Sequence, residues 1–537
     1  MSGGNSLAAA NIGVGIGAFG LASFMGVMQA LSIADVQFPA RSESLYYISL
    51  TAHGVLMALV FTTFFIMGLG YAFSQATLGR ITGRRTAWFA FVLALVGTVM
   101  AAQSILRGQS TVLYTFYPPL QASPLFYIGA TLLVVGSWIW GGVMIASYRG
   151  WRRENPGVPM PLPIHGMLAT IVIWYLATTG LALEVVGMLI PWSLGWVKTI
   201  DPLLARTYFW WFGHPLVYFW ILPAYVVWYT VLPRAAGGKL FSDPLARMVF
   251  ILFVVLSTPV GFHHQFADPG ISARWKLAHT VTTYAILYPS FVTAFTIIAS
   301  LEVAGRMKGA KGLFNWIGRL PWGQPFFAAC ALAMLAFTFG GFGGAINAAY
   351  AMNSMVHNTA WIQGHFHVTL GTTVTLTFMG ATYWLLPRLL GREIRFAGLA
   401  RVQPYLWFLG VAFFSTSYHI AGLRGLPRRV YSGSLSGDNG AAWHGLTVLA
   451  AVGASIMFLS AISFLIVVVA TWLAGRRIEA PAFEFAVPLR PVTALGVWDR
   501  YGLWTCVAVL LVAAAYAYPV IELLAHPRFG SKGFQPF

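Results

Sequence analysis

The sequence predicts an all-α protein built as a polytopic bundle of membrane-spanning helices. Only 9% of its 537 residues are charged and 58% are hydrophobic, whereas soluble domains carry about 25% charged residues. The mean hydropathy is +0.73. A helix needs about 20 apolar residues to cross a hydrocarbon layer of about 30 Å, and the chain contains many uncharged runs of that length. These observations exclude a soluble protein.

The uncharged runs divide into thirteen expected membrane spans, joined by short linkers rich in Pro, Gly and Arg. No linker is long enough to fold as a soluble domain, so residues 1–537 are expected to form a single membrane domain. We find no sequence repeat that would favour an inverted-repeat transporter. The expected spans cover about residues 12–34, 48–75, 87–107, 125–149, 163–192, 206–233, 246–267, 277–304, 325–350, 359–387, 403–423, 445–474 and 501–524.

Basic residues are concentrated in the linkers. The formal net charge is +18, but the Lys and Arg residues lie in short loops between apolar runs, a pattern that reports topology rather than nucleic-acid binding. The linkers after even-numbered spans carry most of them, which predicts a cytoplasmic N-terminus and, because the span number is odd, an external C-terminus. Cys330 and Cys506 lie in apolar runs and indicate neither a disulfide framework nor a thiolate metal site.

Histidines inside apolar runs are the main functional candidates, because an ionisable or metal-binding group is costly within a membrane. In the sequence GHFH at 364–367, His365 and His367 are about 200° apart around a helix. One metal cannot easily bind both rings, whereas two cofactors flanking the helix can, and hemes held by axial imidazoles suit this arrangement. The alternative is two unrelated polar residues in a bundle interior.

A second group of histidines suits copper. In GHPLVY at 213–218, His214 and Tyr218 are four residues apart and share a helical face. His263 and His264 lie near the end of another expected span. Three neutral imidazoles from two helices suit a copper ion, and a buried tyrosine beside it can donate a proton or a hydrogen atom. A hydrogen-bonded helix end is the alternative for the histidine pair. His53, in a span without charge, becomes a ligand candidate only if another axial histidine pairs with it.

Together these motifs resemble subunit I of the heme-copper oxidases, and most closely the B-type branch of bacterial cytochrome c oxidases. The resemblance is carried by RTYFWWFGHPLVYFWILPAY, LSTPVGFHHQFADPG and VHNTAWIQGHFH. It extends from about His53 to Arg429, and the thirteen-span count fits it as well. It implies the catalytic subunit of an enzyme that reduces dioxygen to water and pumps protons.

The resemblance also implies the cofactors. His53 and His367 would ligate a low-spin heme, expected to be heme b by analogy with the branch. His365 would ligate a high-spin heme of a-type, whose free face binds oxygen. The low-spin heme would relay electrons to this reaction centre.

The resemblance also implies a copper site formed by three histidines. His214, His263 and His264 would hold one copper ion opposite the high-spin heme. Tyr218 would be covalently joined to His214 and would serve as a redox-active donor. These two residues are therefore the expected catalytic pair.

Proton supply to a buried site needs hydrogen-bonding side chains or water. Tyr218, Tyr225 and Tyr229 recur at intervals of seven and four, which keeps them on one helical face, and Ser290 and Thr293 form a matching pair on the eighth expected span. This line of tyrosines, called the tyrosine file below, resembles together with the two hydroxyl residues the single proton input route of the B-type branch, analogous to the K-pathway. Ordinary aromatic packing is the alternative for the tyrosines.

Other positions refine the resemblance. A-type oxidases carry a glutamate where Leu216 stands, so a second channel gated by a carboxylate is not expected here. Arg428 and Arg429 resemble the partners of heme propionates, with a solvated loop as the alternative. Asn353 occupies a position where B-type relatives often have aspartate, which puts a proton-loading role for it in doubt. Weaker candidates near the propionates are His357, Asn347 and Tyr114.

The remaining polar features are expected to be structural. The small residues of FGGFGG at 339–344 have the spacing that lets helices approach closely. Glu184, Glu302 and Asp268 lie near the ends of expected spans, where capping or interfacial pairing is the default.

Three alternatives to a cytochrome c oxidase stay open. A nitric oxide reductase of the same superfamily would place iron at the copper position, although Tyr218 favours the oxidase. A quinol oxidase differs mainly in its electron donor. A heme-free channel or transporter belongs to another class.

The expected partners lie outside this chain. They are a subunit II with a dinuclear copper site, a small helical subunit, a soluble cytochrome c or cupredoxin as donor, and the inner membrane of a bacterium or archaeon.

Overall fold

The computed structural model describes residues 3–36, 42–431 and 438–534. Within these ranges the chain is helical, with isolated β-bridges and no extended strand. This architecture confirms the all-α membrane fold predicted from the sequence.

The helices follow one another along the whole chain. In order they are α1 (Gly3–Ile33), α2 (Glu43–Val55), η1 (Leu56–Phe61), α3 (Thr62–Leu78), α4 (Arg84–Leu106), α5 (Pro124–Glu154), α6 (Leu162–Glu184), η2 (Val185–Leu189), α7 (Ile190–Ser193), α8 (Pro202–Thr230), α9 (Leu232–Ala235), α10 (Asp243–Leu256), η3 (Gly261–Gln265), α11 (Ala273–Met307), η4 (Ile317–Arg319), α12 (Pro325–Ala348), α13 (Tyr350–Val356), α14 (Ala360–Leu390), α15 (Ala397–Leu423), α16 (Asp438–Ala474), η6 (Val497–Asp499) and α17 (Tyr501–Ala525).

Eleven helical segments of the described chain are long and apolar enough to cross a membrane. The 31-residue helix α14 adds a further pass. The remaining expected span, 246–267, is not one continuous helix, because α10 ends at Leu256 and the chain resumes as the 3-10 helix η3. Pro259 explains the break, since proline lacks an N–H and disfavours the α conformation of the residue before it.

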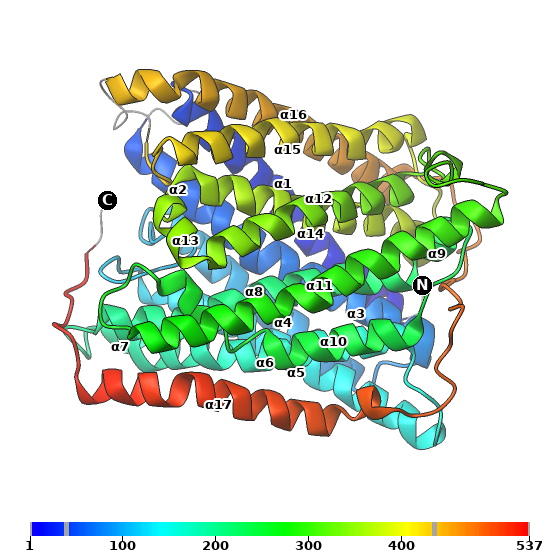
Figure 1. Cartoon of the computed structure of the whole chain (residues 1–537), viewed down its shortest axis with the longest axis horizontal. Coiled ribbons are helices and arrows are strands. Elements are labelled where there is room, and N and C mark those ends of the chain that lie inside the picture. The colour runs from blue at the N-terminus through cyan, green and yellow to red at the C-terminus, as the bar shows by residue number, and fades with distance from the viewer. Residues whose placement is uncertain (1–2, 37–41, 432–437, 535–537) are drawn as a thin grey trace.

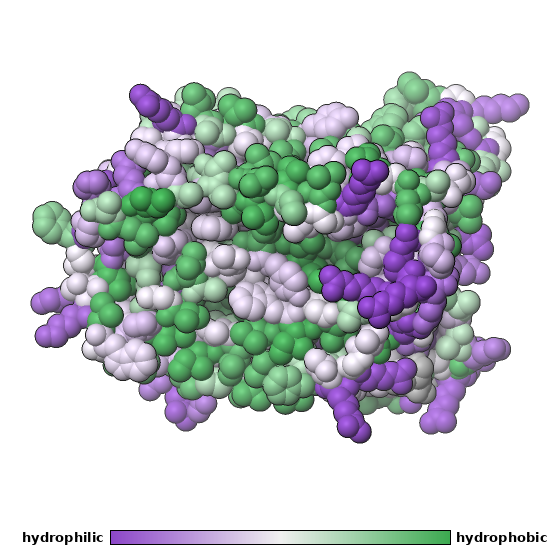
Figure 2. Space-filling model, turned by 90° about the horizontal axis from the view of Figure 1, so that it is seen from below, coloured by the Kyte–Doolittle hydropathy of each residue, from purple (hydrophilic) through white to green (hydrophobic). Residues whose placement is uncertain are grey.

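The bundle has the layout of a membrane protein. The long helices run roughly parallel to one another, and α1 begins at the opposite end of the bundle from the end of α17 (Figure 1). In Figure 2 a broad hydrophobic belt lies between two ends where hydrophilic side chains gather, most densely at the right. This distribution matches a hydrocarbon layer surrounding the middle of the helices.

Glycines set the closest helix contacts. A Cβ on Gly97 would lie 2.4 Å from the carbonyl oxygen of Gly129, and one on Gly129 would lie 2.5 Å from the oxygen of Gly97. Helices α4 and α5 therefore touch backbone to backbone. In the FGGFGG segment of α12, a Cβ on Gly340 would lie 2.4 Å from the methyl group of Thr369 on α14, so the small residues allow α12 to approach α14.

Candidate metal and proton sites

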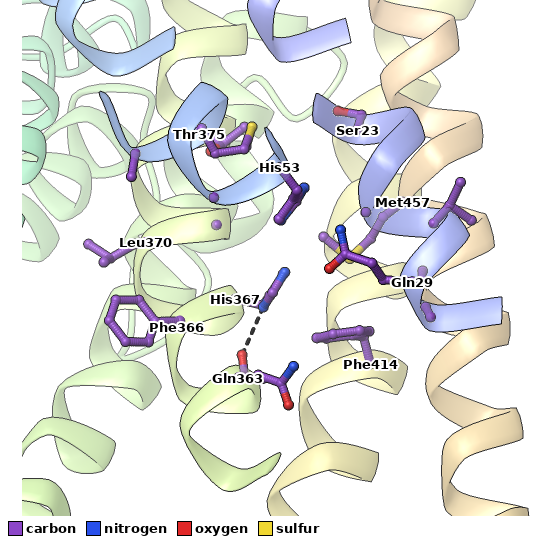
Figure 3. A pocket seen from close by; sticks show the side chains of 18 of the residues that line it. Ser23, Gln29, His53, Gln363, Phe366, His367, Leu370, Thr375, Phe414 and Met457 are labelled. Carbon is purple, nitrogen blue, oxygen red and sulfur yellow. Dashed lines mark hydrogen bonds between the residues drawn. The ribbon is translucent and has the colours of Figure 1, made fainter. Parts of the chain in front are cut away.

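A cavity between α1, α2, α14, α15 and α16 contains His53 and His367 facing each other (Figure 3). Their rings are nearly parallel, at 8°, with centroids 6.3 Å apart. The Nδ1 atom of His53 lies 2.8 Å from the carbonyl oxygen of Ala22, and that of His367 lies 2.8 Å from the carbonyl oxygen of Gln363. A carbonyl oxygen only accepts, so both Nδ1 atoms carry the hydrogen and each Nε2 keeps a free lone pair.

The spacing of these rings fits an ion between them. A metal–imidazole bond of about 2.0 Å, with about 1.1 Å from the nitrogen to the ring centre, places the centroids about 6.2 Å apart across one ion. The observed 6.3 Å agrees with this value. The cavity around the two rings is lined mainly by apolar side chains, including some of η1 and α8 in addition to the five helices named above, as suits a porphyrin held by axial imidazoles.

His365 points away from this cavity. A Cβ on Gly343 of α12 would lie 2.5 Å from its Nδ1 atom, so its ring faces α12. The ring stacks on Trp361 at 18°, with centroids 5.6 Å apart, and Thr369 Oγ1 lies 3.5 Å from Nδ1. The two histidines of α14 thus point to different sides of the helix, as their two-residue spacing predicts.

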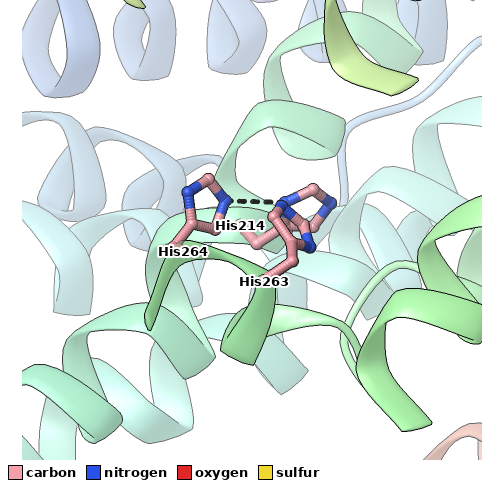
Figure 4. Close-up of side chains that lie close together, drawn as sticks. All are labelled: His214, His263 and His264. Carbon is pink, nitrogen blue, oxygen red and sulfur yellow. Dashed lines mark hydrogen bonds between the residues drawn. The ribbon is translucent and has the colours of Figure 1, made fainter. Parts of the chain in front are cut away.

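Three other imidazoles converge between α8 and η3. His214 lies on α8, and His263 and His264 lie on η3. Their candidate ligand atoms all lie within 4.8 Å of one another (Figure 4), with His214 Nδ1 3.0 Å from His264 Nε2. A single ion bound at about 2.0 Å from each nitrogen would draw them to within about 4 Å, so copper fits after small ring movements.

Local structure positions these three rings. The 3-10 turn after the break at Pro259 brings two consecutive histidines to the same ion position, which a regular helix does not do. His263 Nδ1 lies 2.9 Å from Thr283 Oγ1, whose own hydrogen goes to the carbonyl oxygen of His279. The indole of Trp210 stacks on His264 at 3.8 Å and 5°.

Tyr218 lies beside the His214 ring, with centroids 5.0 Å apart. His214 Nε2 is buried and has no hydrogen-bond partner in the described part of the chain. His214 therefore has one nitrogen facing His264 and the other free. This arrangement is compatible with a metal bond at Nδ1 and a covalent bond at Nε2.

The side chains expected to carry protons to Tyr218 also lie close together in the structure. The Tyr229 hydroxyl donates to Thr293 Oγ1 at 2.9 Å, and the Tyr225 hydroxyl lies beside Ser290. Both tyrosines are completely buried, and their rings are 6.5 Å apart. Tyrosines of α8 and hydroxyl groups of α11 therefore meet in pairs below Tyr218.

Two guanidinium groups line the cavity that contains His53 and His367. Arg428 and Arg429 line it together with Tyr114, and Arg429 lies 5.0 Å above the ring of Tyr114. Burial, and then the neighbouring Arg429, lowers the pKa of Arg428 to about 10. Burial alone would raise the pKa of Tyr114, but Arg429 and Arg428 bring it below the ordinary value. Arg428 Nε and Arg429 Nη2 have no hydrogen-bond partner among the described residues, so an anionic group fits here.

Two of the weaker candidates lie near the arginine pair: Tyr114 is under Arg429, and His357 interacts electrostatically with Arg428. Asn353 donates from Nδ2 to the carbonyl oxygen of Asn347 at 2.8 Å, which joins α13 to the end of α12.

The acidic side chains behave in two ways. Asp268 pairs with Arg206 at 2.9 Å, and Glu302 pairs with Arg306, as expected for carboxylates near span ends. The expectation of capping or pairing is wrong for Glu184, which is completely buried and has no hydrogen-bond partner within the described chain. The sequence could not separate these cases, because each acid lies near the end of an apolar run.

The sequence did not predict the positioning roles of three residues. Gly26, Gly343 and Trp210 hold candidate ligand rings through contacts between segments far apart in the chain, although the FGGFGG spacing did predict a close helix contact at Gly343.

Comparison with known proteins agrees with this geometry. The family described as cytochrome c and quinol oxidase polypeptide I matches residues 6–456. The chain belongs to this family. Cytochrome c oxidase subunit 1 of Thermus thermophilus is 43% identical over 521 residues, which cover 94% of this chain and 92% of the relative. The probable cytochrome c oxidase subunit 1-beta of Nocardia farcinica is 28% identical over 77% of this chain and 69% of its own length.

A solved heme-copper terminal oxidase dimer has the same fold. Its matching chain superposes with a TM-score of 0.96 and 36% sequence identity over 99% of this chain and 95% of its own. The protein is thus the catalytic subunit of a membrane-bound heme-copper oxidase, an oxidoreductase with hemes and copper. Its candidate ligands meet the geometric needs of both kinds of group.

Proposed function

We propose that the chain is the catalytic subunit of a proton-pumping cytochrome c oxidase that reduces dioxygen to water. The observation that carries this proposal is the group of three imidazoles within 4.8 Å with Tyr218 beside the His214 ring. A tyrosine at that place supplies the proton and electron that oxygen reduction needs beyond those of the metals.

The ligand roles follow from ring orientation. His53 and His367 hold the low-spin heme through their free Nε2 atoms, and His365 holds the high-spin heme. The hemes and copper, when bound, relay electrons and supply three of the four electrons that split dioxygen. The Nδ1 hydrogen bonds of His53 and His367 fix the direction of each bond at the low-spin site before a cofactor arrives.

His214 and His263 hold copper with His264. His214 uses Nδ1 for the metal, which leaves its buried Nε2 for the covalent bond to Tyr218. The bond keeps the phenol beside the reaction site and makes it the donor of a hydrogen atom. The apolar neighbours of the ring, such as Phe253, exclude water from the donor.

Protons reach Tyr218 from the cytoplasmic side. The Tyr229–Thr293 hydrogen bond and the Tyr225 hydroxyl beside Ser290 would supply donors and acceptors along α8 and α11. The Tyr225 hydroxyl has no hydrogen-bond partner in the described chain, so water would complete the path. Arg428 and Arg429 bind the propionate groups of the hemes at the opposite end.

The finer assignments rest on the B-type resemblance. We assign heme b to the low-spin site, an a-type heme to the high-spin site and one copper ion to the three histidines. A subunit II with a dinuclear copper site, together with a small helical subunit, completes the enzyme and accepts electrons from a soluble cytochrome c or cupredoxin. The chain forms one domain with its N-terminus in the cytoplasm of a bacterial or archaeal cell.

Metal analysis with an activity assay tests the proposal. We expect one copper per two hemes in the three-histidine site, in addition to the copper of subunit II, and His264→Asn is expected to lose that copper while both hemes stay. Oxygen consumption with reduced cytochrome c is expected to fall about 100-fold or more in this variant. Iron in place of copper would instead indicate a nitric oxide reductase, and oxidation of quinol alone would indicate a quinol oxidase. A protein without pigment would indicate a channel or transporter.

Pyridine hemochrome spectra test the heme types separately. Absence of any a-type heme would overturn that assignment without affecting the iron–copper centre.

A further inference from the structure

Glu184, at the end of α6, is an acidic side chain without a structural explanation. Its exposed fraction is 0%, and neither carboxylate oxygen has a hydrogen-bond partner among the residues the structure describes. None of the ion pairs within the described chain includes it. An ionised carboxylate is strongly disfavoured in such a place, and an ionisable side chain within a membrane is a functional candidate. The neutral acid is therefore the resting form.

The position of Glu184 along the bundle relates it to the copper ligands. A Cβ on Gly180, one turn earlier in α6, would lie 2.8 Å from the carbonyl oxygen of Tyr208 and 2.7 Å from Trp211 Cγ. Because α8 runs in the opposite direction, Glu184 lies level with the turn of α8 before Tyr208. That level is roughly 13 Å from His214 along the helix axis, on the side away from the tyrosine file.

The backbone beside Glu184 is unusual. The π-helix η2 starts at the next residue, Val185, and π-helical turns occur frequently at functional sites. The other π-helix of the described chain, η1, starts three residues after His53. Each wide turn thus begins within three residues of a titratable side chain.

Aromatic contacts lead from the neighbourhood of Glu184 to α8. Its electrostatic neighbour is Tyr127 of α5, whose ring contacts Phe116 at 6.3 Å. Phe116 in turn contacts Phe209 of α8 at 5.2 Å. Buried polar atoms without a hydrogen-bond partner among the described residues also occur at positions 115, 117, 192 and 210, and ordered water is the usual partner of such atoms. They are Thr115 Oγ1, Tyr117 Oη, Trp192 Nε1 and Trp210 Nε1.

We propose that Glu184 is a proton-holding group between the metal centre and the outer surface, a role that rests on the proposed function. The O–H bond of the carboxylic acid breaks and its proton passes to water on the outer side. The carboxylate then takes a proton from water on the metal side. An electron arriving at the metal centre favours the neutral acid, and the positive charge left by its departure favours the carboxylate.

Redox-difference infrared spectroscopy of the complete enzyme tests this role. We expect reduction to change the C=O stretch of a protonated carboxylic acid and this band to shift in D₂O. Glu184→Gln is expected to remove the band and Glu184→Asp to move it. Glu302→Gln, which alters a partly exposed carboxylate paired with Arg306, is the matched control and is expected to leave the band unchanged.

Proton release gives a second readout. In vesicles, Glu184→Gln is expected to lower the protons released per dioxygen at least twofold while heme and copper contents stay at the wild-type level. Identical carboxylic-acid bands in the wild type and Glu184→Gln would overturn the role of Glu184. A wild-type enzyme that lacks copper or does not consume dioxygen would overturn the proposed function instead, and the infrared comparison would still report whether Glu184 is protonated.

Discussion

Replacing Gly26 by alanine is expected to displace the His53 ring and weaken binding at the low-spin site. An added Cβ would lie 2.9 Å from His53 Cε1 and 3.0 Å from Nδ1, whereas carbon atoms in contact are separated by about 3.5–4.0 Å. The ring must therefore move by roughly 0.6–1.1 Å. That movement is enough to break the 2.8 Å hydrogen bond to the carbonyl oxygen of Ala22.

The cost of this change has two parts. Loss of the hydrogen bond contributes about 1 kcal/mol, and overpacking contributes about 1–3 kcal/mol. The combined 2–4 kcal/mol corresponds to a roughly 30- to 1000-fold weaker hold on the heme at this site. Electron paramagnetic resonance of the oxidised enzyme is expected to show the low-spin signal reduced, with a new high-spin signal in its place.

Gly17→Ala on the same helix is the matched control, because a Cβ there meets no atom within 4 Å. It is expected to leave the low-spin signal unchanged. A normal low-spin spectrum in Gly26→Ala would refute the reasoning, since it would mean that the His53 ring does not depend on α1 for its position.

Three further changes test other parts of the structure. Tyr218→Phe removes the phenol oxygen, so oxygen reduction is expected to fall about 100-fold or more, and peptide mass spectrometry should no longer find a cross-link to this residue. Tyr229→Phe breaks the hydrogen bond to the α11 hydroxyl, so proton uptake measured after flash-induced oxygen binding is expected to slow at least tenfold, whereas Tyr71→Phe should match the wild type. Asp499→Asn removes one of two acids from a buried arginine and is expected to cost about 2–4 kcal/mol of stability. Glu484→Gln, in an exposed pair, should cost less than about 1 kcal/mol, as a thermal melt of the detergent-solubilised protein can show.

The fold could be predicted because a membrane imposes a strong pattern on sequence. Every expected span except 246–267 matches a helical segment of the described chain, since about 20 uncharged residues have few other places to lie. The hydropathy pattern did not predict the helix break between α10 and η3, because hydropathy does not report backbone conformation. Pro259 gave the local signal for it, and the resulting 3-10 turn brings His263 and His264 together.

The candidate site was only partly readable from the sequence. Helical spacing predicts that His365 and His367 point apart, and this part needs no tertiary information. The partner of His367 across the cavity could not be derived in that way, because His53 lies more than 300 residues earlier and nothing local marks it. The burial of Glu184 was also hidden, since a carboxylate near a span end looks the same whether it faces water or another helix.

The candidate ligand rings are oriented by the protein itself. His53 and His367 each donate from Nδ1 to a backbone carbonyl oxygen, and His263 donates from Nδ1 to a threonine hydroxyl. In each case the anchored nitrogen fixes the tautomer and leaves Nε2 for a ligand. His214 differs, because its Nδ1 faces the other histidines and its Nε2 is free beside Tyr218. His214 and His264 instead contact each other at 3.0 Å, so both rings lack an anchor to the backbone or to a hydroxyl within the described chain. In the proposed enzyme the covalent bond to Tyr218 would hold the His214 ring, as the hydrogen bonds hold the other anchored rings.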